Sequence, residues 1–271
     1  MKLTDFDAVI FDMDGTLCHE DEALPGAAAL VRWLNERDVR AGCLTNKSTS
    51  TPAELARRFE AMGIHLPAHR IFTGAQAMGV WIRRHWTQPR VFLFASRAVR
   101  AELGDDVAVV ETADEPCDAV AVSTHMMADN VPFDLERAMT ALIHLRRGAE
   151  LVVACVDRVR PLRHGRYDFE SGSWGMLFSY AANVAPERIH FLGKPDPDFY
   201  LGMCRRMGVR PERCLMVGDN LDSDIRGAVA VGMKSALLLT GVATRQDAAG
   251  SDVHPDFIFE DPAALLRKLG R

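Results

Sequence analysis

The sequence predicts an α/β protein in which a smaller α/β domain is inserted into a doubly wound, Rossmann-like parallel sheet. Three observations support this fold class. Short apolar runs alternate with amphipathic, helix-like segments along most of the chain. Several of these runs stop abruptly at polar residues, as strands do at the ligand-binding edge of a parallel sheet. About 150 residues separate two of these polar ends, Thr45 and Lys194, which leaves room for a second domain.

The first strand is predicted at residues 8–11, a continuous and partly β-branched apolar run. Asp12 and Asp14 follow it directly. Because alternate residues of an extended chain share a face, both carboxylates can point into one site. Gly15 then lets the backbone turn away. An ordinary Asp-Gly turn after a strand would explain Asp14. It does not explain Asp12, a charged residue directly after an apolar run.

The following elements alternate in the same way. Pro25 and Gly26 open an amphipathic helix, and Thr51, Pro52 and Glu54 have the order typical of a helix start. The predicted elements of this first part are helix 26–38, strand 40–44, helix 51–63, strand 71–73 and a helix that ends near residue 86.

Two further series of strands and helices follow. The middle part contains predicted strands 91–94, 107–110, 119–122 and 151–154 and helices 96–103, 134–147 and 173–183. The last part contains strands 188–192, 214–217, 235–239 and 257–259 and helices 196–207, 222–231 and 262–269. We therefore expect residues 1–82 and 188–271 to form a discontinuous core domain, and residues 83–187 to form the inserted cap domain.

The composition argues against several classes of protein. The chain has 271 residues, of which 48% are hydrophobic and 25% charged, and this is ordinary for a globular domain pair. Its net charge of −5 disfavours nucleic-acid binding through bulk positive charge, and no apolar segment approaches the length of a membrane span. The six cysteines form no Cys-x-x-Cys pair, which is typical of free thiols in a reducing compartment. We expect a cytoplasmic protein with no nucleic-acid or membrane partner.

The carboxylates at the strand ends predict a metal-assisted reaction on a phosphate ester. Asp12 would attack phosphorus and become an aspartyl phosphate, and Asp14 would act as general acid and then as general base. Asp12, Asp14 and Asp219 would bind Mg²⁺, since a hard divalent cation prefers oxygen ligands. Asp224 would hold these ligands in place without binding the metal itself. Alternatively, it is an exposed acid at the start of a helix, stabilised by the helix dipole.

Three further residues complement these carboxylates. Thr45, Asn46 and Lys194 also follow apolar strands, and they would bind the transferring phosphoryl group and stabilise the charge on its oxygens. Taken singly, Lys194 could be a solvated loop lysine and Thr45 simply the last residue of its strand. Their convergence at one edge of the sheet favours a site.

Four sequence segments together identify a family. They are Phe-Asp-Met-Asp-Gly-Thr-Leu (11–17), Leu-Thr-Asn (44–46), Gly-Lys-Pro (193–195) and Val-Gly-Asp-Asn-Leu-Asp-Ser-Asp-Ile (217–225). In this order they resemble the four motifs of the haloacid dehalogenase superfamily of phosphohydrolases. The long interval between the second and third segments resembles the branch whose cap domain is inserted there. Type IIA members of that branch include p-nitrophenyl phosphatase-like, phosphoglycolate and pyridoxal phosphate phosphatases, and four segments of this chain are similar to them: Pro25-Gly26-Ala27, Ile71-Phe72-Thr73, Gly172-Ser173 and Gly193-Lys194-Pro195. The resemblance implies a Mg²⁺-dependent phosphatase that acts on a small phosphorylated metabolite.

The sequence departs from this family pattern at several positions. Lys47 replaces an asparagine that family members often carry, and it would add positive charge near the phosphate. Where relatives often read Asn-Pro-Asp, this chain reads Cys155-Val156-Asp157, followed by a basic stretch, residues 158–166. This stretch is either a solvated surface loop or a segment that binds an acidic leaving group of the substrate. In the second case Arg160 is the first candidate for the contact.

Other functions stay open on the sequence alone. A phosphomutase or phosphotransferase shares the aspartate pair, and a catalytically silent binding protein could keep the fold. A dehalogenase is disfavoured because halide release needs no acid/base at Asp14. Some members of the type IIA branch, which this chain resembles, dimerise through the cap, so a homodimer is also an open alternative. The identity of the phosphate ester is expected to depend on the cap.

Overall fold

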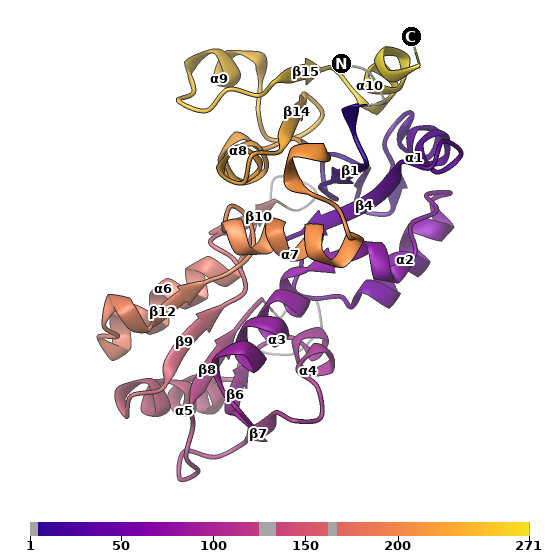
Figure 1. Cartoon of the computed structure of the whole chain (residues 1–271). Helices are drawn as coiled ribbons and strands as arrows, with labels where there is room; N and C mark the ends of the chain where they lie inside the picture. The colour runs from indigo at the N-terminus through magenta and orange to yellow at the C-terminus, as the bar shows by residue number, and fades with distance from the viewer. Residues whose placement is uncertain (1–4, 125–133, 162–166, 271) are drawn as a thin grey trace. The chain divides into compact units, whose positions relative to one another are not determined.

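The computed structural model describes residues 5–124, 134–161 and 167–270 (Figure 1). The chain forms two compact units. The first unit comprises Met1–Thr45, Pro52–Phe72 and Lys194–Arg271, and the second comprises Asn46–Thr51 and Thr73–Gly193. Each unit is built around its own sheet.

The sheet of the first unit has six strands. Their order across the sheet is β15 (Phe257–Phe259), β14 (Lys234–Leu238), β13 (Cys214–Gly218), β1 (Ala8–Phe11), β4 (Arg40–Thr45) and β5 (Ile71–Thr73). From β15 to β4 all neighbours pair in parallel. Strand β1 lies at the centre and is fully buried, as its apolar sequence predicts. A parallel sheet of this kind needs helices on both faces.

The helices of the first unit supply that cover. They are α1 (Ala27–Asn35), α2 (Pro52–Ala61), α7 (Pro197–Met207), α8 (Arg226–Ala230), α9 (Arg245–Gly250) and α10 (Pro262–Leu269). Apolar residues of α1, α2 and α10 share one buried cluster with residues of β1, β4, β13 and β14. Helix α7 packs against α8 and β4. A short hairpin, β2 (Cys18–His19) and β3 (Glu22–Ala23), follows β1.

The second unit repeats this layered plan with five parallel strands. Their order is β12 (Ile189–Phe191), β9 (Glu150–Val153), β8 (Ala119–Val122), β6 (Arg90–Phe94) and β7 (Ala108–Val110). The helices are α3 (Gly74–His85), α4 (Arg97–Glu102), α5 (Leu135–Arg146) and α6 (Ser171–Ala182). Two strands form a separate antiparallel hairpin, β10 (Val159–Pro161) and β11 (Tyr167–Phe169).

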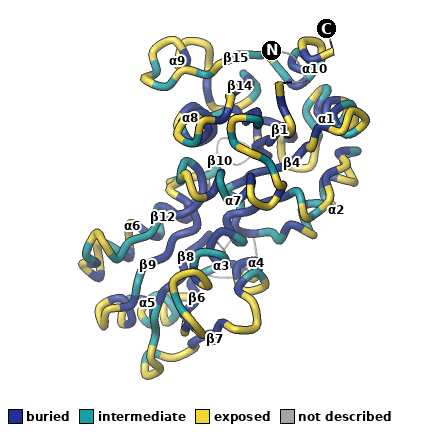
Figure 2. The backbone as a smooth tube through the Cα atoms, viewed as in Figure 1, coloured by how far each residue is buried: buried dark blue, intermediate teal, exposed yellow. Residues whose placement is uncertain are grey.

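The strand β6 shows how the second unit is doubly wound. Val91 and Leu93 join a cluster with residues of α3 and α4, whereas Phe92 and Phe94 join a cluster with residues of α5 and α6. Because alternate side chains point to opposite faces, one strand packs on both helical layers. Figure 2 shows that the central strands, such as β1, β8 and β9, are mostly buried.

The structure confirms the predicted fold class, and it differs from the sequence analysis in where the units divide. Helix α3 and strand β12 belong to the second unit, although we expected residues up to 82 and from 188 in the core. Helix α3 shares a buried cluster with β6 and β9, and β12 pairs with β9, so packing and pairing place both elements there. The two hairpins and α9 were not predicted, since their strands and helix are too short to produce a clear period.

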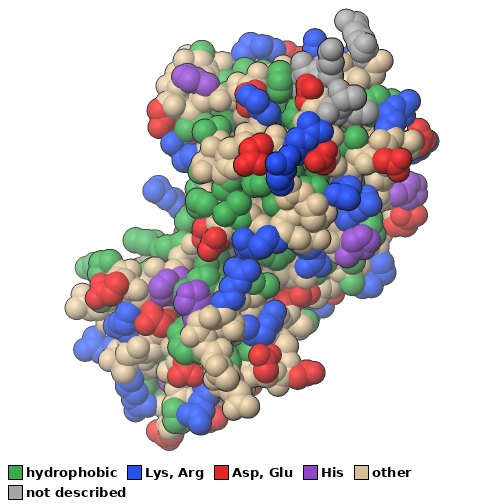
Figure 3. All heavy atoms as spheres, in the orientation of Figure 1, with side chains coloured by type: hydrophobic (Ala, Val, Ile, Leu, Met, Phe, Trp, Pro, Cys, Tyr) green, Lys and Arg blue, Asp and Glu red, His purple; other side chains and the backbone are tan. Residues whose placement is uncertain are grey.

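None of the helices in the described part of the chain combines the length and the apolar composition that a membrane span needs. Figure 3 shows basic and acidic side chains interspersed over the visible face.

Candidate active site

Asp12 lies at the carboxyl end of the central strand of the first unit. Its backbone N–H donates to the carbonyl of Val217 over 2.9 Å and so continues the pairing of β1 with β13. Phe11 is in register with Val217 on one side and with Cys43 on the other. The ends of the flanking strands therefore bring Asp219 and Thr45 to the same edge of the sheet as Asp12. Both neighbours are buried.

Asp219 is held in place by the turn that follows Asp12. Gly15 has a φ of 79°, a left-handed conformation that favours glycine. In addition, a Cβ atom at this position would lie 2.6 Å from Oδ2 of Asp219, which is too close for any other residue. The same Oδ2 accepts a 2.7 Å hydrogen bond from the backbone N–H of Val242. Thr16 donates its hydroxyl to Oδ1 over 3.5 Å. The carboxylate thus has a fixed position beside Asp12.

Lys194 brings the positive charge into this cluster. Its ammonium Nζ lies 2.5 Å from Oδ1 of Asp12 and 2.7 Å from Oδ1 of Asp224, and the side chain is buried. We expected the strand before Lys194 to belong to the core domain, and this expectation was wrong. The preceding strand β12 pairs with β9 in the second unit, and Lys194 lies on the connection that enters α7 in the first.

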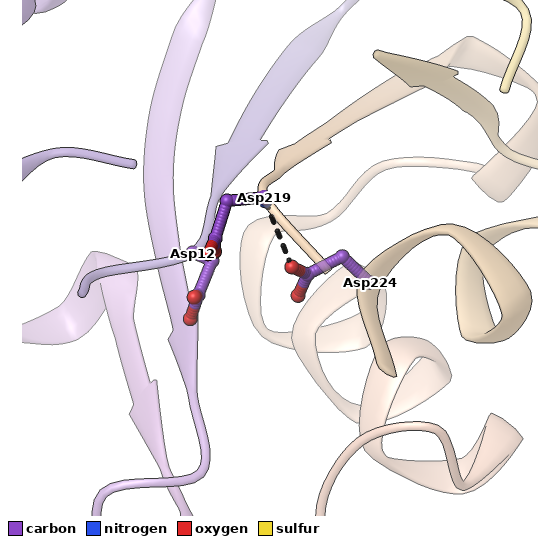
Figure 4. Close-up of side chains that lie close together, drawn as sticks. All are labelled: Asp12, Asp219 and Asp224. Atoms are coloured by element: carbon purple, nitrogen blue, oxygen red, sulfur yellow. Dashed lines mark hydrogen bonds between the residues drawn. The ribbon is translucent and has the colours of Figure 1, made fainter. Parts of the chain in front are cut away.

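Asp224 is brought to the site by an irregular helical turn. Residues Leu221–Ile225 form a wide, π-type turn before α8, where a regular helix was predicted. Oδ2 of Asp224 accepts hydrogen bonds from the backbone N–H groups of Asp219 (3.1 Å) and Asn220 (3.0 Å). Figure 4 shows the first of these bonds and the three aspartates together. Asp224 is fully buried, so it is not the exposed helix-start acid of the alternative interpretation.

The cluster carries an excess of buried negative charge. One oxygen each from Asp12, Asp219 and Asp224 lie within 4.8 Å of one another, with the Lys194 ammonium as their basic partner. Burial raises the pKa of the Asp12 carboxyl well above its usual range, against the opposing charge of Lys194. Burial, followed by the charge of Asp224, raises the pKa of Asp219 to about 6.

The pKa of Lys194 moves in the direction that keeps it charged. Burial by itself would lower the pKa of this ammonium, but the charges of Asp12 and Asp224 outweigh that effect and raise it well above its usual value. One cation beside three carboxylates leaves about two negative charges without a counterpart. A divalent cation with oxygen ligands fits this donor set.

Asp14 differs from the other aspartates because it is exposed. The three-carboxylate group in the described part of the chain does not include it. Asp14 lies one residue beyond Met13 in the turn after β1, and its backbone forms a bridge with Cys18 at the start of the first hairpin. The Asp14 side chain is therefore accessible from solvent, unlike that of Asp12.

The remaining predicted residues belong to the second unit. Asn46 and Lys47 fall in its Asn46–Thr51 segment, and the Asn46 side-chain amide donates a 2.8 Å hydrogen bond to Asp157. Arg160 lies in β10, where its Nη2 donates to Asp168 over 2.8 Å and its Nε lies 3.9 Å from Oε1 of Glu170. Three basic residues of the same stretch, Arg163, His164 and Arg166, lie outside the described residues.

Comparison with known proteins identifies the family of this chain. The model of the haloacid dehalogenase-like hydrolase family matches residues 9–106, and a second model of HAD-hydrolase-like proteins matches residues 191–265. The human glycerol-3-phosphate phosphatase is 30% identical in sequence, over 98% of this chain and 92% of its own length. This chain belongs to the haloacid dehalogenase-like hydrolases. Within the superfamily it falls in the type IIA branch, and it is an enzyme that acts on phosphomonoesters.

Solved structures of this hydrolase family extend the similarity to the whole fold. The 4-nitrophenylphosphatase of Thermotoga maritima superposes with a TM-score of 0.88 at 26% identity, and 98% of each chain is covered. A glycerol phosphate phosphatase of Mycobacterium tuberculosis, solved in complex with magnesium, gives a TM-score of 0.86 at 27% identity. That match covers 99% of this chain and 79% of the other.

Two site features of this hydrolase were not found by sequence reasoning. The backbone N–H of Val242 donates a hydrogen bond to Asp219. The sequence does not indicate this contact, because the side chain of residue 242 takes no part in it. Tyr200 in α7 is buried and donates its hydroxyl to the carbonyl of Ser223. A tyrosine among the apolar residues of a buried helix face was the available signal, because a buried hydroxyl requires a partner.

Proposed function

We propose that this chain is a Mg²⁺-dependent phosphatase that hydrolyses a small phosphomonoester through an aspartyl phosphate on Asp12. The observation that supports this most is the position of the Asp12 carboxylate, 2.5 Å from the Lys194 ammonium and beside two further buried carboxylates. A carboxylate and a phosphate dianion repel each other, so the Lys194 ammonium and a bound divalent cation would be needed to offset that repulsion.

In the first step a carboxylate oxygen of Asp12 attacks phosphorus, and the bond between phosphorus and the ester oxygen breaks. The leaving alkoxide takes a proton from Asp14, which is exposed and so accessible to the ester oxygen. Lys194 and the hydroxyl of Thr45 stabilise the charge on the phosphoryl oxygens. We assign Asn46 and Lys47 to substrate binding as well, since they directly follow Thr45 in the chain.

In the second step Asp14 takes a proton from a water molecule, which attacks phosphorus and breaks its bond to Asp12. Inorganic phosphate leaves, and the Asp12 carboxylate is regenerated. Asp224 takes no part in bond making, because its oxygens bind Lys194 and the backbone N–H groups of Asp219 and Asn220.

We assign Asp12, Asp14 and Asp219 to Mg²⁺; the Asp12 and Asp219 side chains lie together in the buried cluster, whereas that of Asp14 is exposed. Bound there, the cation would supply positive charge that offsets the carboxylates and the phosphate dianion.

Phosphate release from 4-nitrophenyl phosphate in the presence of Mg²⁺ tests the proposal. Asp12→Asn should abolish turnover, and Asp14→Asn should allow phosphorylation of Asp12 but slow hydrolysis, so that the intermediate is detected as a mass increase after acid quenching. An inactive wild type would overturn the proposal. Transfer of the phosphoryl group to added sugar or polyol in preference to water would favour a phosphomutase or phosphotransferase instead.

We further propose that the leaving group is a small neutral polyol, with glycerol phosphate as the first compound to test. Two relatives that this chain resembles are named for that substrate class. The pairing of Arg160 with Asp168 also supports a neutral leaving group, since the guanidinium already has a carboxylate partner. A panel of phosphorylated polyols, sugars and carboxylic acids would rank the substrates, and a phosphorylated acid at its head would contradict the proposal.

We also propose that the protein forms a homodimer through α5 and α6. Leu135, Met139 and Ile143 are exposed and spaced four residues apart, so they form one stripe along α5. The neighbouring α6 carries no charged residue, yet it exposes Met176, Leu177 and Tyr180.

The charges of α5 favour a second copy as the partner. Glu136 lies at its first turn, and the exposed Arg146 and Arg147 lie at its end. If two copies of α5 pack antiparallel with Met139 of each against Ile143 of the other, Glu136 of each lies opposite Arg146 of the other, as a two-fold symmetric interface requires. The free cysteines among the described residues support a reducing compartment, the cytoplasm, for this assembly.

A further inference from the structure

Tyr200 connects helix α7 to the irregular turn that carries Asp224. Its phenolic hydroxyl donates a 2.6 Å hydrogen bond to the carbonyl of Ser223, and it lies 3.3 Å from the carbonyl of Asp224. The whole side chain is buried. A buried hydroxyl with two carbonyl acceptors is a specific contact, because the same ring without oxygen would fill the space equally well.

The structure accommodates this ring by means of Gly227 in α8. A Cβ atom at this position would collide with the ring and the hydroxyl of Tyr200. The absence of a side chain at residue 227 therefore allows the tyrosine to reach the turn.

The turn needs this contact because its backbone is irregular. In the wide turn Leu221–Ile225 the N–H of Ile225 bonds back to the carbonyl of Asn220 over 3.2 Å, five residues earlier. Such wide turns are rare, and they occur often at functional sites. The hydroxyl of Tyr200 supplies a donor from outside the turn at the two residues that set the direction of the Asp224 side chain.

From this turn a continuous series of contacts leads to the proposed nucleophile. Asp224 accepts a hydrogen bond from Lys194 over 2.7 Å, and the same ammonium lies 2.5 Å from Asp12. We propose that Tyr200 is a positioning residue: by holding the carbonyls of residues 223 and 224, it fixes Asp224 and, through it, the Lys194 ammonium at the carboxylate that attacks phosphorus. This inference rests on the proposed function, because it assigns the role of Lys194 in that reaction.

The principal test is Tyr200→Phe, which keeps the ring and removes the donor. We expect kcat for 4-nitrophenyl phosphate to fall about tenfold, the equivalent of one ordinary hydrogen bond, with KM changed less than twofold. Phe59→Leu is the matched control: it truncates another fully buried aromatic residue of the first unit, in α2. Its activity per folded molecule should stay at the wild-type level even where its melting temperature falls further than that of Tyr200→Phe.

A double-mutant cycle separates positioning from a general structural role. Asp224→Asn breaks the series of contacts between the turn and Lys194, so Tyr200→Phe should cost less than twofold further in that background. Gly227→Ala, which displaces the ring, should reproduce the loss of kcat seen for Tyr200→Phe.

Two results would overturn the inference. One is a Tyr200→Phe enzyme with wild-type kcat; the other is a full tenfold loss that persists in the Asp224→Asn background. Both presuppose an active wild-type enzyme, whereas an inactive wild type would refute the proposed phosphatase itself. The two failures are therefore distinguishable.

Discussion

The ammonium group of Lys194 lies 2.7 Å from Oδ1 of Asp224, and both side chains are buried. The residues come from two different helical connections, the entry to α7 and the turn before α8. Their contact joins the two connections directly beneath the end of β1. Because a buried ammonium is stable only beside negative charge, we expect this pair to contribute to stability as well as to the proposed reaction.

Asp224→Asn tests the stabilising part of this pair. The substitution keeps the shape of the side chain but removes the charge that faces Lys194, and we expect the free energy of unfolding of the first unit to fall by roughly 3 kcal/mol. Chemical denaturation measures this change. The control is Asp222→Asn two residues earlier, whose side chain is exposed and should cost almost nothing. Equal effects of the two substitutions would contradict the assignment.

Magnesium should stabilise the protein through the aspartate cluster. At a Mg²⁺ concentration 100 times the dissociation constant, linkage predicts a gain of about 2.7 kcal/mol, seen as a higher melting temperature in calorimetry. Asp219→Asn should remove most of this gain, because it replaces a carboxylate of the cluster by an amide. Asp252→Asn, at an exposed ion pair with Arg226, is the control and should keep the full response. A response to Ca²⁺ or Na⁺ equal to that to Mg²⁺ would argue against a specific site.

His144 should make the stability of the second unit depend on pH. Burial lowers the pKa of this imidazole below its usual 6.5, and Arg147 acts in the same direction while the carbonyl of Thr112 and the charge of Glu115 oppose it. The unfolded chain then binds a proton more readily than the folded one. Stability from this residue is complete above pH 6.5 and is lost as the pH falls through the window between the two pKa values.

Melting temperatures between pH 8 and pH 5 measure this effect of His144. The His144→Gln variant should lose less stability than the wild type on acidification, since its side chain does not titrate. His254→Gln, at an exposed position, should follow the wild-type curve. Parallel curves for all three proteins would show that the imidazole is not responsible.

Arg160→Ala tests whether hairpin β10–β11 contacts the leaving group of the substrate. Since Arg160 pairs with the largely buried Asp168, we expect its loss to weaken the hairpin and to lower kcat/KM by a similar factor for glycerol 3-phosphate and for 4-nitrophenyl phosphate. Asp168→Asn should have a similar effect on both substrates. A loss confined to one anionic substrate would instead identify Arg160 as a direct contact to the leaving group.

The dimer proposal is tested with Met139→Glu. A charge in the middle of the α5 stripe should convert a dimer into a monomer, as measured by sedimentation or light scattering over a range of concentrations. Val229→Glu places the same charge on another exposed apolar residue, in α8, and should leave the assembly unchanged. A wild-type protein that stays monomeric at all concentrations would refute the proposal.

The sequence predicted most of the fold because apolar runs and helical periods mark most elements directly. Strand β1 and helix α10 begin and end where their patterns indicate. Strand β12 shows the limit of such reasoning. Its residues Ile189–Phe191 read as an ordinary short strand, and nothing in their local pattern distinguishes pairing with β9 from pairing in the other sheet. That choice is made by long-range packing, which a single sequence does not display.

The same distinction applies to the candidate site. Asp12, Thr45, Lys194 and Asp219 could be predicted because each follows a recognisable segment, and the structure brings all four into the first unit. The wide turn at Leu221–Ile225 could not, since its sequence fits a regular helix equally well. The contact from Tyr200 depends on that turn and on Gly227, so it too required the structure.

The segment Asn46–Thr51 has a consequence for anyone who wishes to recombine this protein with its relatives. Because this segment belongs to the second unit while both of its flanks belong to the first, the chain passes between the units four times, after residues 45, 51, 72 and 193. A cap exchanged as one continuous cassette, residues 73–193, would leave Asn46 behind and separate it from Asp157, its hydrogen-bond partner. A chimera should therefore transplant the two pieces together, so that each graft keeps its own version of this pair.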